Sequence, residues 1–390
     1  MSRRWRFTLA ATAIAVLGAG PILSSTTASA APVTSKAPAA EPADPGTALA
    51  GLWSADGKTT HLFYVGSDHQ LSNWYGDGTA WDNAALGVGQ PAAVGTGLTA
   101  IYSPDGKETY VFYVGANGHL YDWSYDDKKW DNKELGTGEP AALGTGLAAY
   151  WSPNGKQINV FYVGANNQVY NWYGDGKTWG NAALGDGHGE AAALGTGLAA
   201  YWSPNGKQAH LFYVGANRKV YNWYGDGAGW ANAALGNGDG EPGAIGRGLA
   251  AFWDPDGTQA NLFYIGTDDE VHTWADSDTG WTNSALGDDG EPAGLGRGLA
   301  AIWNPDKTQA RVFYMGEDGQ IYNWVLTGTT WTNSALGSGE AATEGTGLAA
   351  LWNPDGKRAN VYYMADKGAP YSAPIYNWVF NGSSWANGQL

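Results

Sequence analysis

Seven tryptophans, each just after a tight turn, are the residues of this chain best suited to binding chemistry. An indole at a turn presents a flat apolar face with a hydrogen-bond donor on its edge. That combination suits the C–H face of a sugar ring, so carbohydrate recognition is the first chemistry to consider. We call these residues the third series, because two other aromatic series precede them in each repeat: Trp81, Trp130, Trp179, Trp230, Trp281, Trp331 and Trp385.

The aromatic residues recur with a period of about 50 residues, so the chain consists of seven repeats. Seven residues separate the second series from the third in every repeat, and 21 separate the first from the second in six repeats and 26 in the last. The first series is Trp53, Tyr102, Trp151, Trp202, Trp253, Trp303 and Trp352. The second series is Trp74, Trp123, Trp172, Trp223, Trp274, Trp324 and Trp378.

Each repeat predicts four short strands that would position these aromatics. In the third repeat the strands are expected within 146–151, 158–164, 168–173 and 178–185, separated by turns rich in Gly, Asn and Asp. No helical periodicity is visible after the N-terminal region. Four strands in a repeat of this length are typical of a propeller blade. The sequence therefore predicts an all-β fold, a seven-bladed β-propeller with four antiparallel strands per blade, over residues 47–390.

The termini of the ring give less information. The seven copies are complete within 47–390, and no strand is visibly exchanged between the two ends. The insertion 366–374 makes the last copy atypical, and Tyr371 within it is the candidate for a contact unique to that blade.

The N-terminal region predicts export. Residues 1–30 contain early arginines, an apolar stretch and an Ala-Ser-Ala site, which is the pattern of a secretion signal peptide. Residues 31–46 form an Ala/Pro-rich linker. We expect a secreted, extracellular protein. Because it has no cysteine, its stability must come from core burial or bound ions instead of disulfides.

The charge of the chain restricts its partners. The formal net charge is −16, and it is more negative still once the three arginines of residues 1–30 are removed. An acidic protein is poorly suited to the phosphate backbone of nucleic acid or to anionic lipid, so neither nucleic-acid binding nor membrane insertion is expected. An acidic surface that keeps a secreted protein soluble is the simplest explanation.

The three aromatic series are expected to play different parts. Trp172 and its second-series equivalents lie mid-strand, where a repeated tryptophan packs one blade against the next. Trp179 and its third-series equivalents begin a strand near the surface, where they either bind a sugar or pack between blades. Clefts between adjacent blades would recur seven times, and seven weak sites of one kind, one in each cleft, would give avidity on a clustered glycan.

The repeat resembles that of the fungal fucose-specific lectins and of the bacterial seven-bladed propeller lectins. The pattern that carries the resemblance is apolar-Ala-Ala-x-Trp, then x-Val-Phe-Tyr, then Val-Tyr-x-Trp-x-x-Gly-x-x-x-Trp, and it covers all seven copies. The resemblance implies a sugar site built from an arginine, a glutamate twelve residues later and a terminal aromatic. In this chain the arginine position holds His61, Tyr110, Asn159, His210, Asn261, Arg311 and Asn360. The glutamate position holds Asn73, Asp122, Asn171, Asn222, Thr273, Asn323 and Asn377.

The spacing of that site is thus kept, but its charged pair is not, because Arg311 alone retains the basic group. An asparagine still offers a donor and an acceptor to sugar hydroxyls. We therefore expect a non-catalytic lectin with no cofactor, whose partners are cell-surface or microbial glycans. Its predicted carbohydrate-binding residues are Asn73, Trp81, Asp122, Trp130, Asn171, Trp179, Asn222, Trp230, Trp281, Arg311, Asn323, Trp331, Asn377 and Trp385.

Three other functions compete with this prediction. A propeller glycosidase would need clustered arginines or a carboxylate pair that breaks the symmetry of the ring, and neither is visible. The acidic loops 185–190, 236–242 and 287–292 are calcium candidates, but none matches a known calcium-loop spacing in full, so solvated acidic turns are the default interpretation. A scaffold that binds a protein partner in a secreted complex would show one or two blades diverging at exposed positions. Glycan binding instead predicts the same aromatic in every blade.

Overall fold

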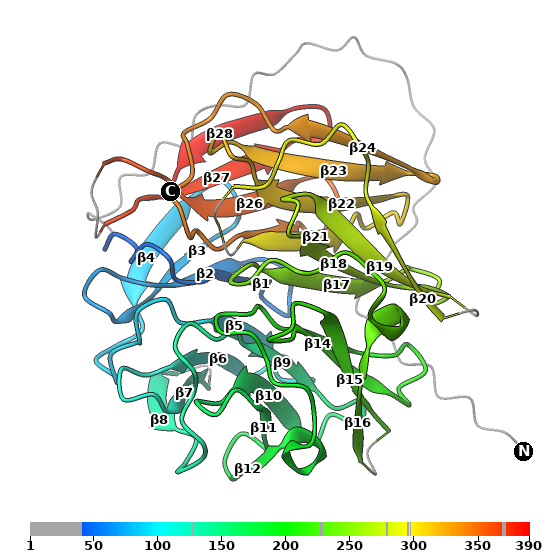
Figure 1. The fold of residues 1–390 in the computed structure, drawn as a ribbon. Coiled ribbons are helices and arrows are strands. Elements are labelled where there is room, and N and C mark those ends of the chain that lie inside the picture. The colour runs from blue at the N-terminus through cyan, green and yellow to red at the C-terminus, as the bar shows by residue number, and fades with distance from the viewer. Residues whose placement is uncertain are drawn as a thin grey trace, which may run out of the picture.

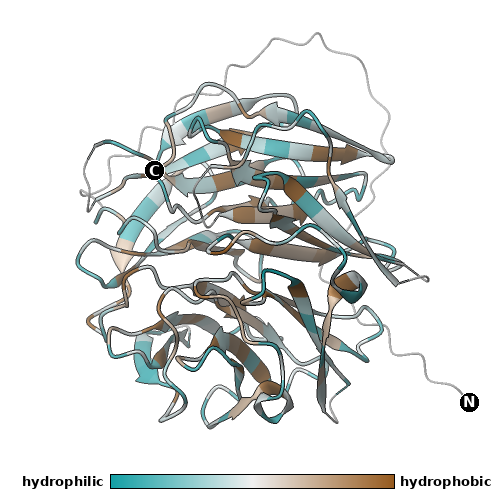
Figure 2. Cartoon of the chain, viewed as in Figure 1, coloured by the Kyte–Doolittle hydropathy of each residue, from teal (hydrophilic) through white to brown (hydrophobic). Residues whose placement is uncertain are grey.

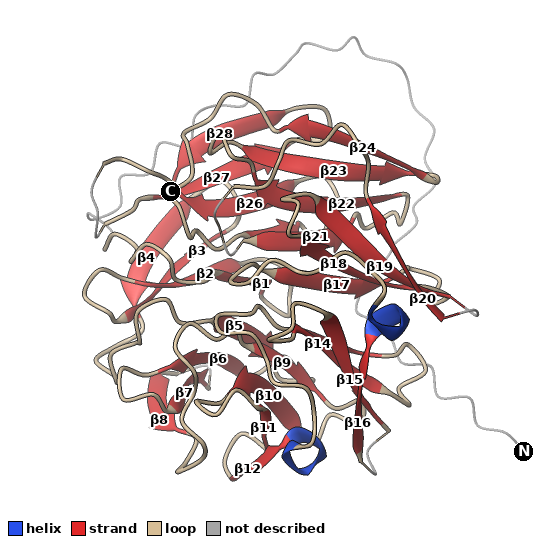
Figure 3. Ribbon diagram, in the orientation of Figure 1, coloured by secondary structure: helices blue, strands red, loops and turns tan. Residues whose placement is uncertain are grey.

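The computed structural model describes residues 41–390 except 127, 227–228, 278–279, 295, 297 and 369–371. Its 28 strands form seven sheets of four antiparallel strands, each sheet taking four consecutive strands of the chain. The sheets follow one another around a ring, and the first sheet meets the last (Figure 1). The predicted seven-bladed β-propeller is therefore confirmed. Two short 3-10 turns are the only helical elements of the described residues (Figure 3).

The blades follow one another in chain order, each from its inner strand to its outer strand. Blade 1 consists of β1 Ala50–Trp53, β2 Thr60–Val65, β3 Leu71–Gly76 and β4 Trp81–Ala85, and blade 2 of β5 Leu98–Tyr102, β6 Thr109–Val114, β7 Leu120–Tyr125 and β8 Trp130–Glu134. Blade 3 consists of β9 Ala148–Trp151, β10 Ile158–Val163, β11 Val169–Gly174 and β12 Trp179–Ala183, followed by the 3-10 turn η1 Leu184–Gly187. Blade 4 consists of β13 Ala199–Trp202, β14 Ala209–Val214, β15 Val220–Gly225 and β16 Trp230–Ala234, followed by the 3-10 turn η2 Leu235–Gly238. Blades 5 to 7 consist of β17 Leu249–Trp253, β18 Ala260–Ile265, β19 Val271–Ser277, β20 Gly280–Ala285; β21 Leu299–Trp303, β22 Gln309–Met315, β23 Ile321–Thr327, β24 Thr330–Ala335; and β25 Ala349–Trp352, β26 Ala359–Met364, β27 Ile375–Phe380, β28 Trp385–Gln389.

Each blade is most hydrophobic in its middle. The second strand of each blade is almost wholly buried, as in β10, where Phe161 and Tyr162 are fully inaccessible. The first strand is rich in alanine because seven such strands converge on the central channel, where larger side chains would collide. Figure 2 shows the resulting pattern, with hydrophobic stretches in the inner strands and hydrophilic ones in the loops.

The second-series tryptophans pack as the sequence predicts. All seven are between 2 and 4% exposed. Trp172 lies over the loop that enters its blade, so close that a Cβ added at Gly138 would fall 2.4 Å from its ring. The same fit recurs at Trp223, which leaves 2.0 Å for a Cβ at Gly189. Glycine is therefore required in this loop, because any side chain would displace the indole.

The ring is closed by the N-terminal segment and the insertion of the last blade. Ala43 forms one isolated bridge to Gly66, as the matching residue of each later blade does, and a second bridge to Ala373. The Ala43 and Ala373 backbones exchange two N–H···O hydrogen bonds of 2.9 Å. No whole strand is exchanged among the described residues, as expected. The insertion in the last copy thus pairs with the segment around Ala43, which lies four residues before the predicted domain boundary at 47.

Several predictions concern segments outside the described residues. These are the signal peptide at 1–30, most of the linker at 31–46 and Tyr371 in the insertion. Within the described part of the chain, no helix is long and apolar enough to cross a membrane.

Candidate functional site between the blades

A pocket of about 570 Å³ lies between blades 3 and 4. It contains one residue from each of the three positions that the sequence predicts for sugar binding: the arginine position, the glutamate position and the terminal aromatic. It opens at the end of the ring where the turns between first and second strands and between third and fourth strands lie. Blade 3 contributes Tyr150, Asn159 and Asn171, and blade 4 contributes Trp202 and Trp230. The site is thus assembled from two neighbouring repeats.

The pairing of these residues differs from the sequence-based expectation. Asn171 and Trp179 belong to one repeat and were expected to share a site. In the structure Asn171 shares its pocket with Trp230 of the next blade. Trp179 instead packs on Phe112 of the preceding blade, with ring centroids 5.8 Å apart. Each third-series tryptophan thus packs on the blade before its own, so Trp230 contributes to the site of blade 3 and Trp179 does not.

The third series combines packing with partial exposure. Each of its tryptophans meets an aromatic ring on the second strand of the preceding blade edge-on, at 5.5–5.8 Å between centroids. Six of the seven are half-buried, and Trp81 is buried at 4% exposure. The two roles that the sequence left open are therefore compatible, because one edge of the indole packs while other atoms face the pocket.

The asparagine at the glutamate position has a buried side-chain oxygen without a hydrogen-bond partner. Asn171 donates its Nδ2 to Asn159 Oδ1 at 2.9 Å, and Asn171 Oδ1 is buried without a hydrogen-bond partner among the described residues. Burying such an acceptor unpaired costs about 1–3 kcal/mol, so native structures rarely tolerate it without a purpose. The same unpaired side-chain oxygen recurs across the ring, at Asn73, Asp122, Asn171, Asn222, Thr273 and Asn377.

The first-series tryptophans are pocket residues that the sequence analysis did not assign. Trp202 lines the pocket, and its Nε1 donor is buried with no acceptor within the described ranges. The ring centroid of Tyr150 lies 5.7 Å from that of Trp202, and the Tyr150 hydroxyl has no hydrogen-bond partner among the described residues either. The unpaired indole donor recurs at Trp53, Trp151, Trp202, Trp253, Trp303 and Trp352. The sequence signal for this role is a tryptophan that ends a strand of small residues.

The equivalent sites between the blades, numbered by the blade that holds the arginine-position residue, differ in that residue. In the first and fourth pockets it is a histidine, and His210 receives the Asn222 amide at 3.0 Å. Burial lowers the pKa of His210 to about 4, so the imidazole is neutral at physiological pH. In the sixth pocket it is Arg311, whose Nη1 donates to Asn323 Oδ1 at 2.8 Å. Asn323 therefore uses the oxygen that its equivalents leave unpaired.

The second pocket contains an acid where most others contain an amide. Asp122 is 2% exposed, and burial raises its pKa to about 7, against a smaller lowering effect of Lys133. A carboxyl that ionises near neutral pH offers a donor below that pH and acceptors above it. Ligand binding in this pocket should therefore depend on pH more than binding in the others.

The pockets also differ in how far their walls close. The last residue of the third strand is glycine in three blades, at Gly76, Gly174 and Gly225. In blade 4 this leaves room beside Trp230, and Gly225 lines the pocket. In blade 7 the same position is Phe380, whose ring centroid lies 5.1 Å from that of Trp385.

The described residues gather few groups suited to metal binding or catalysis. Asp268, Glu270 and His272 place ligand atoms within 4.8 Å of one another, but His272 Nε2 already contacts Asp268 at 2.9 Å. The acidic loops at 185–190, 236–242 and 287–292 contribute no such group of three within the described ranges. The buried arginines Arg247 and Arg311 lie in different blades and do not form a cluster of the sialidase kind.

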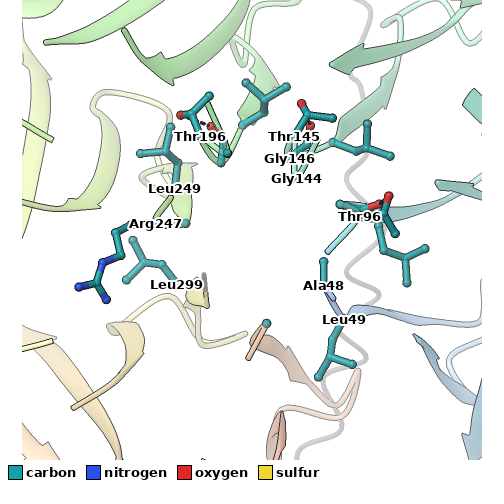
Figure 4. A pocket seen from close by; sticks show the side chains of 18 of the residues that line it. Ala48, Leu49, Thr96, Gly144, Thr145, Gly146, Thr196, Arg247, Leu249 and Leu299 are labelled. Carbon is teal, nitrogen blue, oxygen red and sulfur yellow. Dashed lines mark hydrogen bonds between the residues drawn. The ribbon is translucent and has the colours of Figure 1, made fainter. Parts of the chain in front are cut away.

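A second, smaller pocket of about 120 Å³ lies at the far mouth of the central channel (Figure 4). Its ring of threonines is used internally: Thr145 Oγ1 donates to Gly146 O and accepts from Val163 N, both at 2.9 Å. The sequence has arginine in place of threonine in two repeats, and the side chain of one of these arginines, Arg247, points away from the opening (Figure 4). This mouth offers few free groups to a sugar, so the pockets between the blades remain the candidate sites.

Comparison with known proteins gives the same picture of the fold. The family model described as "Fungal fucose-specific lectin" matches residues 96–390. No curated protein matches the chain. Among solved structures, the BP39L lectin from Burkholderia pseudomallei aligns with a TM-score of 0.70 at 19% identity, over 89% of this chain and 99% of that one.

Two fungal structures are also similar. AofleA from Arthrobotrys oligospora aligns with a TM-score of 0.56 at 14% identity, over 76% of this chain and 87% of its own. The Aleuria aurantia lectin, described as a six-bladed β-propeller, aligns with a TM-score of 0.54 at 19% identity, over 75% of this chain and 97% of its own. At these identities the structural likeness concerns the fold.

Proposed function

The chain belongs to the family of fungal fucose-specific lectins, and we propose that it is an exported, non-catalytic lectin that binds glycans in the pockets between its blades. Each pocket takes one sugar residue. The ring presents up to seven such pockets on one end of the molecule, so binding to a clustered glycan gains by avidity.

One observation carries the proposal: the pocket between blades 3 and 4 is lined by unpaired polar groups of the kinds that sugar hydroxyls need. Trp202 Nε1 is a donor, Asn171 Oδ1 is an acceptor, and the Tyr150 hydroxyl acts as either. Burial raises the pKa of Tyr150 well above its usual range, which keeps this hydroxyl protonated. Trp230 adds the flat apolar face. A hydroxyl-rich ligand would satisfy these groups together, and an apolar one would not.

The same residues argue against a simple transfer of fucose specificity. An arginine and glutamate pair makes strong, charge-assisted hydrogen bonds to a sugar. The pocket between blades 3 and 4 has Asn159 and Asn171 in those positions, so its hydrogen bonds are those of neutral groups. We infer weaker binding per site and a preference for a different, neutral sugar.

A glycan array tests this function directly. The mature protein, fluorescently labelled, is applied to an array that includes microbial polysaccharides and fucosylated glycans. We expect selective binding to densely displayed glycans, competed by the free sugar only at high concentration. Absence of binding to every glycan on the array would refute the proposal.

Exposed residues at the opposite end of the ring favour a second function, the binding of a protein partner. Four aliphatic residues at equivalent positions of the loops between blades are exposed: Val94 at 67%, Leu143 at 84%, Leu194 at 62% and Ile245 at 46%. Exposed apolar side chains that gather on one face are typical of protein contact sites. A protein partner on this end would leave the sugar pockets free. A variant with Leu143→Ser and Leu194→Ser should then lose partner binding and keep glycan binding.

A further inference from the structure

Arg311 is a buried cation to which the structure provides no counter-charge. Its residue exposure is 7%, and no ion pair of the described residues involves it. Its hydrogen-bond acceptors, Asn323 Oδ1 at 2.8 Å and Gln309 Oε1 at 3.3 Å, are neutral. Burial lowers the pKa of Arg311, and no carboxylate opposes that effect. An arginine nevertheless stays protonated in proteins, so the charge is present and uncompensated.

The other buried arginine of the described residues shows what compensation looks like. Arg247 is 8% exposed and pairs through Nη2 with Asp269 at 3.3 Å. Arg311 has aromatic rings instead: its guanidinium carbon lies 4.9 Å from the Phe380 centroid and 5.8 Å from that of Trp385. Cation–π contacts offset part of the cost of burial, but they leave hydrogen-bond donors unused.

The guanidinium donors of Arg311 belong to the position that Asn159 occupies in the pocket between blades 3 and 4. Arg311 Nε is buried without an acceptor among the described residues, as is the Trp352 Nε1 donor of the neighbouring blade. Trp352 and Phe380 meet edge-on at 6.0 Å, so the two donors border one aromatic wall. The site around Arg311 therefore offers donors and a positive charge, and the side-chain oxygen that is unpaired at the equivalent position of the other six blades is here taken up by Arg311.

We propose that the site around Arg311, between blades 6 and 7, binds a sugar that carries a carboxylate, that is, a uronic acid, with Arg311 as the group that pairs its charge. This inference rests on the proposed lectin function and names the ligand class of one of its sites. A carboxylate matches the planar fork of a guanidinium and accepts hydrogen bonds without donating any. The pockets with asparagine or histidine at the Arg311 position lack a cation and select neutral sugars.

The test compares matched pairs of methyl glycosides that differ only in the acid group: glucose and glucuronate, galactose and galacturonate, mannose and mannuronate. Each is titrated into the full mature protein by calorimetry at low and high salt. We expect at least one uronate to bind tenfold or more tightly than its neutral partner, at one site per chain, with the preference weakened by salt. Equal affinity of acid and neutral sugar in all three pairs would overturn the inference.

Variants assign the site. In Arg311→Gln the preference for the uronate should fall below twofold, whereas Arg311→Lys should retain part of it. Arg218→Gln removes an exposed arginine in the turn between β14 and β15, outside the sites between the blades; it is the matched control and should leave the preference intact. Asn159→Arg places an arginine beside Asn171 and should add a second uronate site, which tests the idea even if Arg311→Gln fails to fold. A uronate preference that survives in folded Arg311→Gln would overturn it.

Two further results separate the possible failures. If glucose 6-sulfate binds as tightly as glucuronate, the pocket recognises any anion, and the assignment to carboxylates is wrong. If neutral glycans bind on the array and no uronate is preferred, the lectin function stands and this inference alone fails. If no glycan of either kind binds, both fail.

Discussion

Trp230 of the fourth blade lies edge-on against Phe161 of the third, with ring centroids 5.7 Å apart and ring planes at 76°. The same indole lines the pocket that contains Asn171. One side chain therefore joins two blades and forms a wall of the site, so stability and binding are coupled at this residue.

Replacing Trp230 should separate these two contributions. Trp230→Ala removes both the packing and the apolar face, and we expect a loss of about 2–4 kcal/mol in the free energy of unfolding together with weaker glycan binding. Trp230→Phe keeps most of the packing and should lose less than half as much stability. Denaturant unfolding and calorimetric titration measure the two effects. A Trp230→Ala protein as stable as the wild type would show that the contact with Phe161 contributes little.

The folding stability should depend on pH through Asp122. Its folded pKa of about 7 lies above its ordinary value of 3.8, so the folded state binds a proton that the unfolded state has lost between these two pH values. Stability contributed by this group is therefore full below pH 4 and declines as the pH rises toward 7, by on the order of 4 kcal/mol in total. Asp122→Asn should remove this decline and raise the Tm at pH 8 but not at pH 3.5.

Thermal unfolding of wild type and Asp122→Asn across this pH range checks the prediction. Asp131→Asn is a suitable control, since Asp131 is solvent-accessible and Lys133 holds its pKa below the ordinary value. If Asp122→Asn and the wild type showed the same pH profile, the buried carboxyl would not be the source of the dependence.

Closure of the ring should depend on Ala43. Ala43→Pro removes the N–H that donates to Ala373 O and fits poorly in a fully buried site. We expect a loss of about 3 kcal/mol in stability, and unfolding that begins at the interface of blades 7 and 1. Hydrogen exchange should show faster exchange in β1 and β26 than in β10 of the variant. Uniform exchange across the blades would mean that the N-terminal bridge does not close the ring.

The sequence was sufficient to predict the blades and the packing role of Trp172, because both depend on patterns that recur within one repeat. It was not sufficient to pair Asn171 with Trp230. Those residues lie in different repeats, and whether they share a site depends on how neighbouring blades pack against each other. The bridge between Ala43 and Ala373 is a single contact with no periodic signal. The sequence places Trp202 in a packed strand, and its unpaired Nε1 becomes visible only in three dimensions.

The central claim is that the unpaired donors and acceptors between the blades exist to bind sugars. The most direct test replaces the six first-series tryptophans, Trp53, Trp151, Trp202, Trp253, Trp303 and Trp352, by phenylalanine. This keeps an aromatic ring at each position and removes one buried, unpaired donor from each of six sites. We expect a folded protein with a lower Tm, because removal of the unpaired donors offsets only part of the lost packing.

The measurement is binding of this sixfold variant to the glycan array, at the same concentration of folded protein as the wild type. Each pocket should lose about 1–2 kcal/mol of binding free energy, and avidity multiplies the loss, so we predict a fall in apparent affinity of at least about a hundredfold. A folded variant that binds the same glycans as strongly as the wild type would contradict the account.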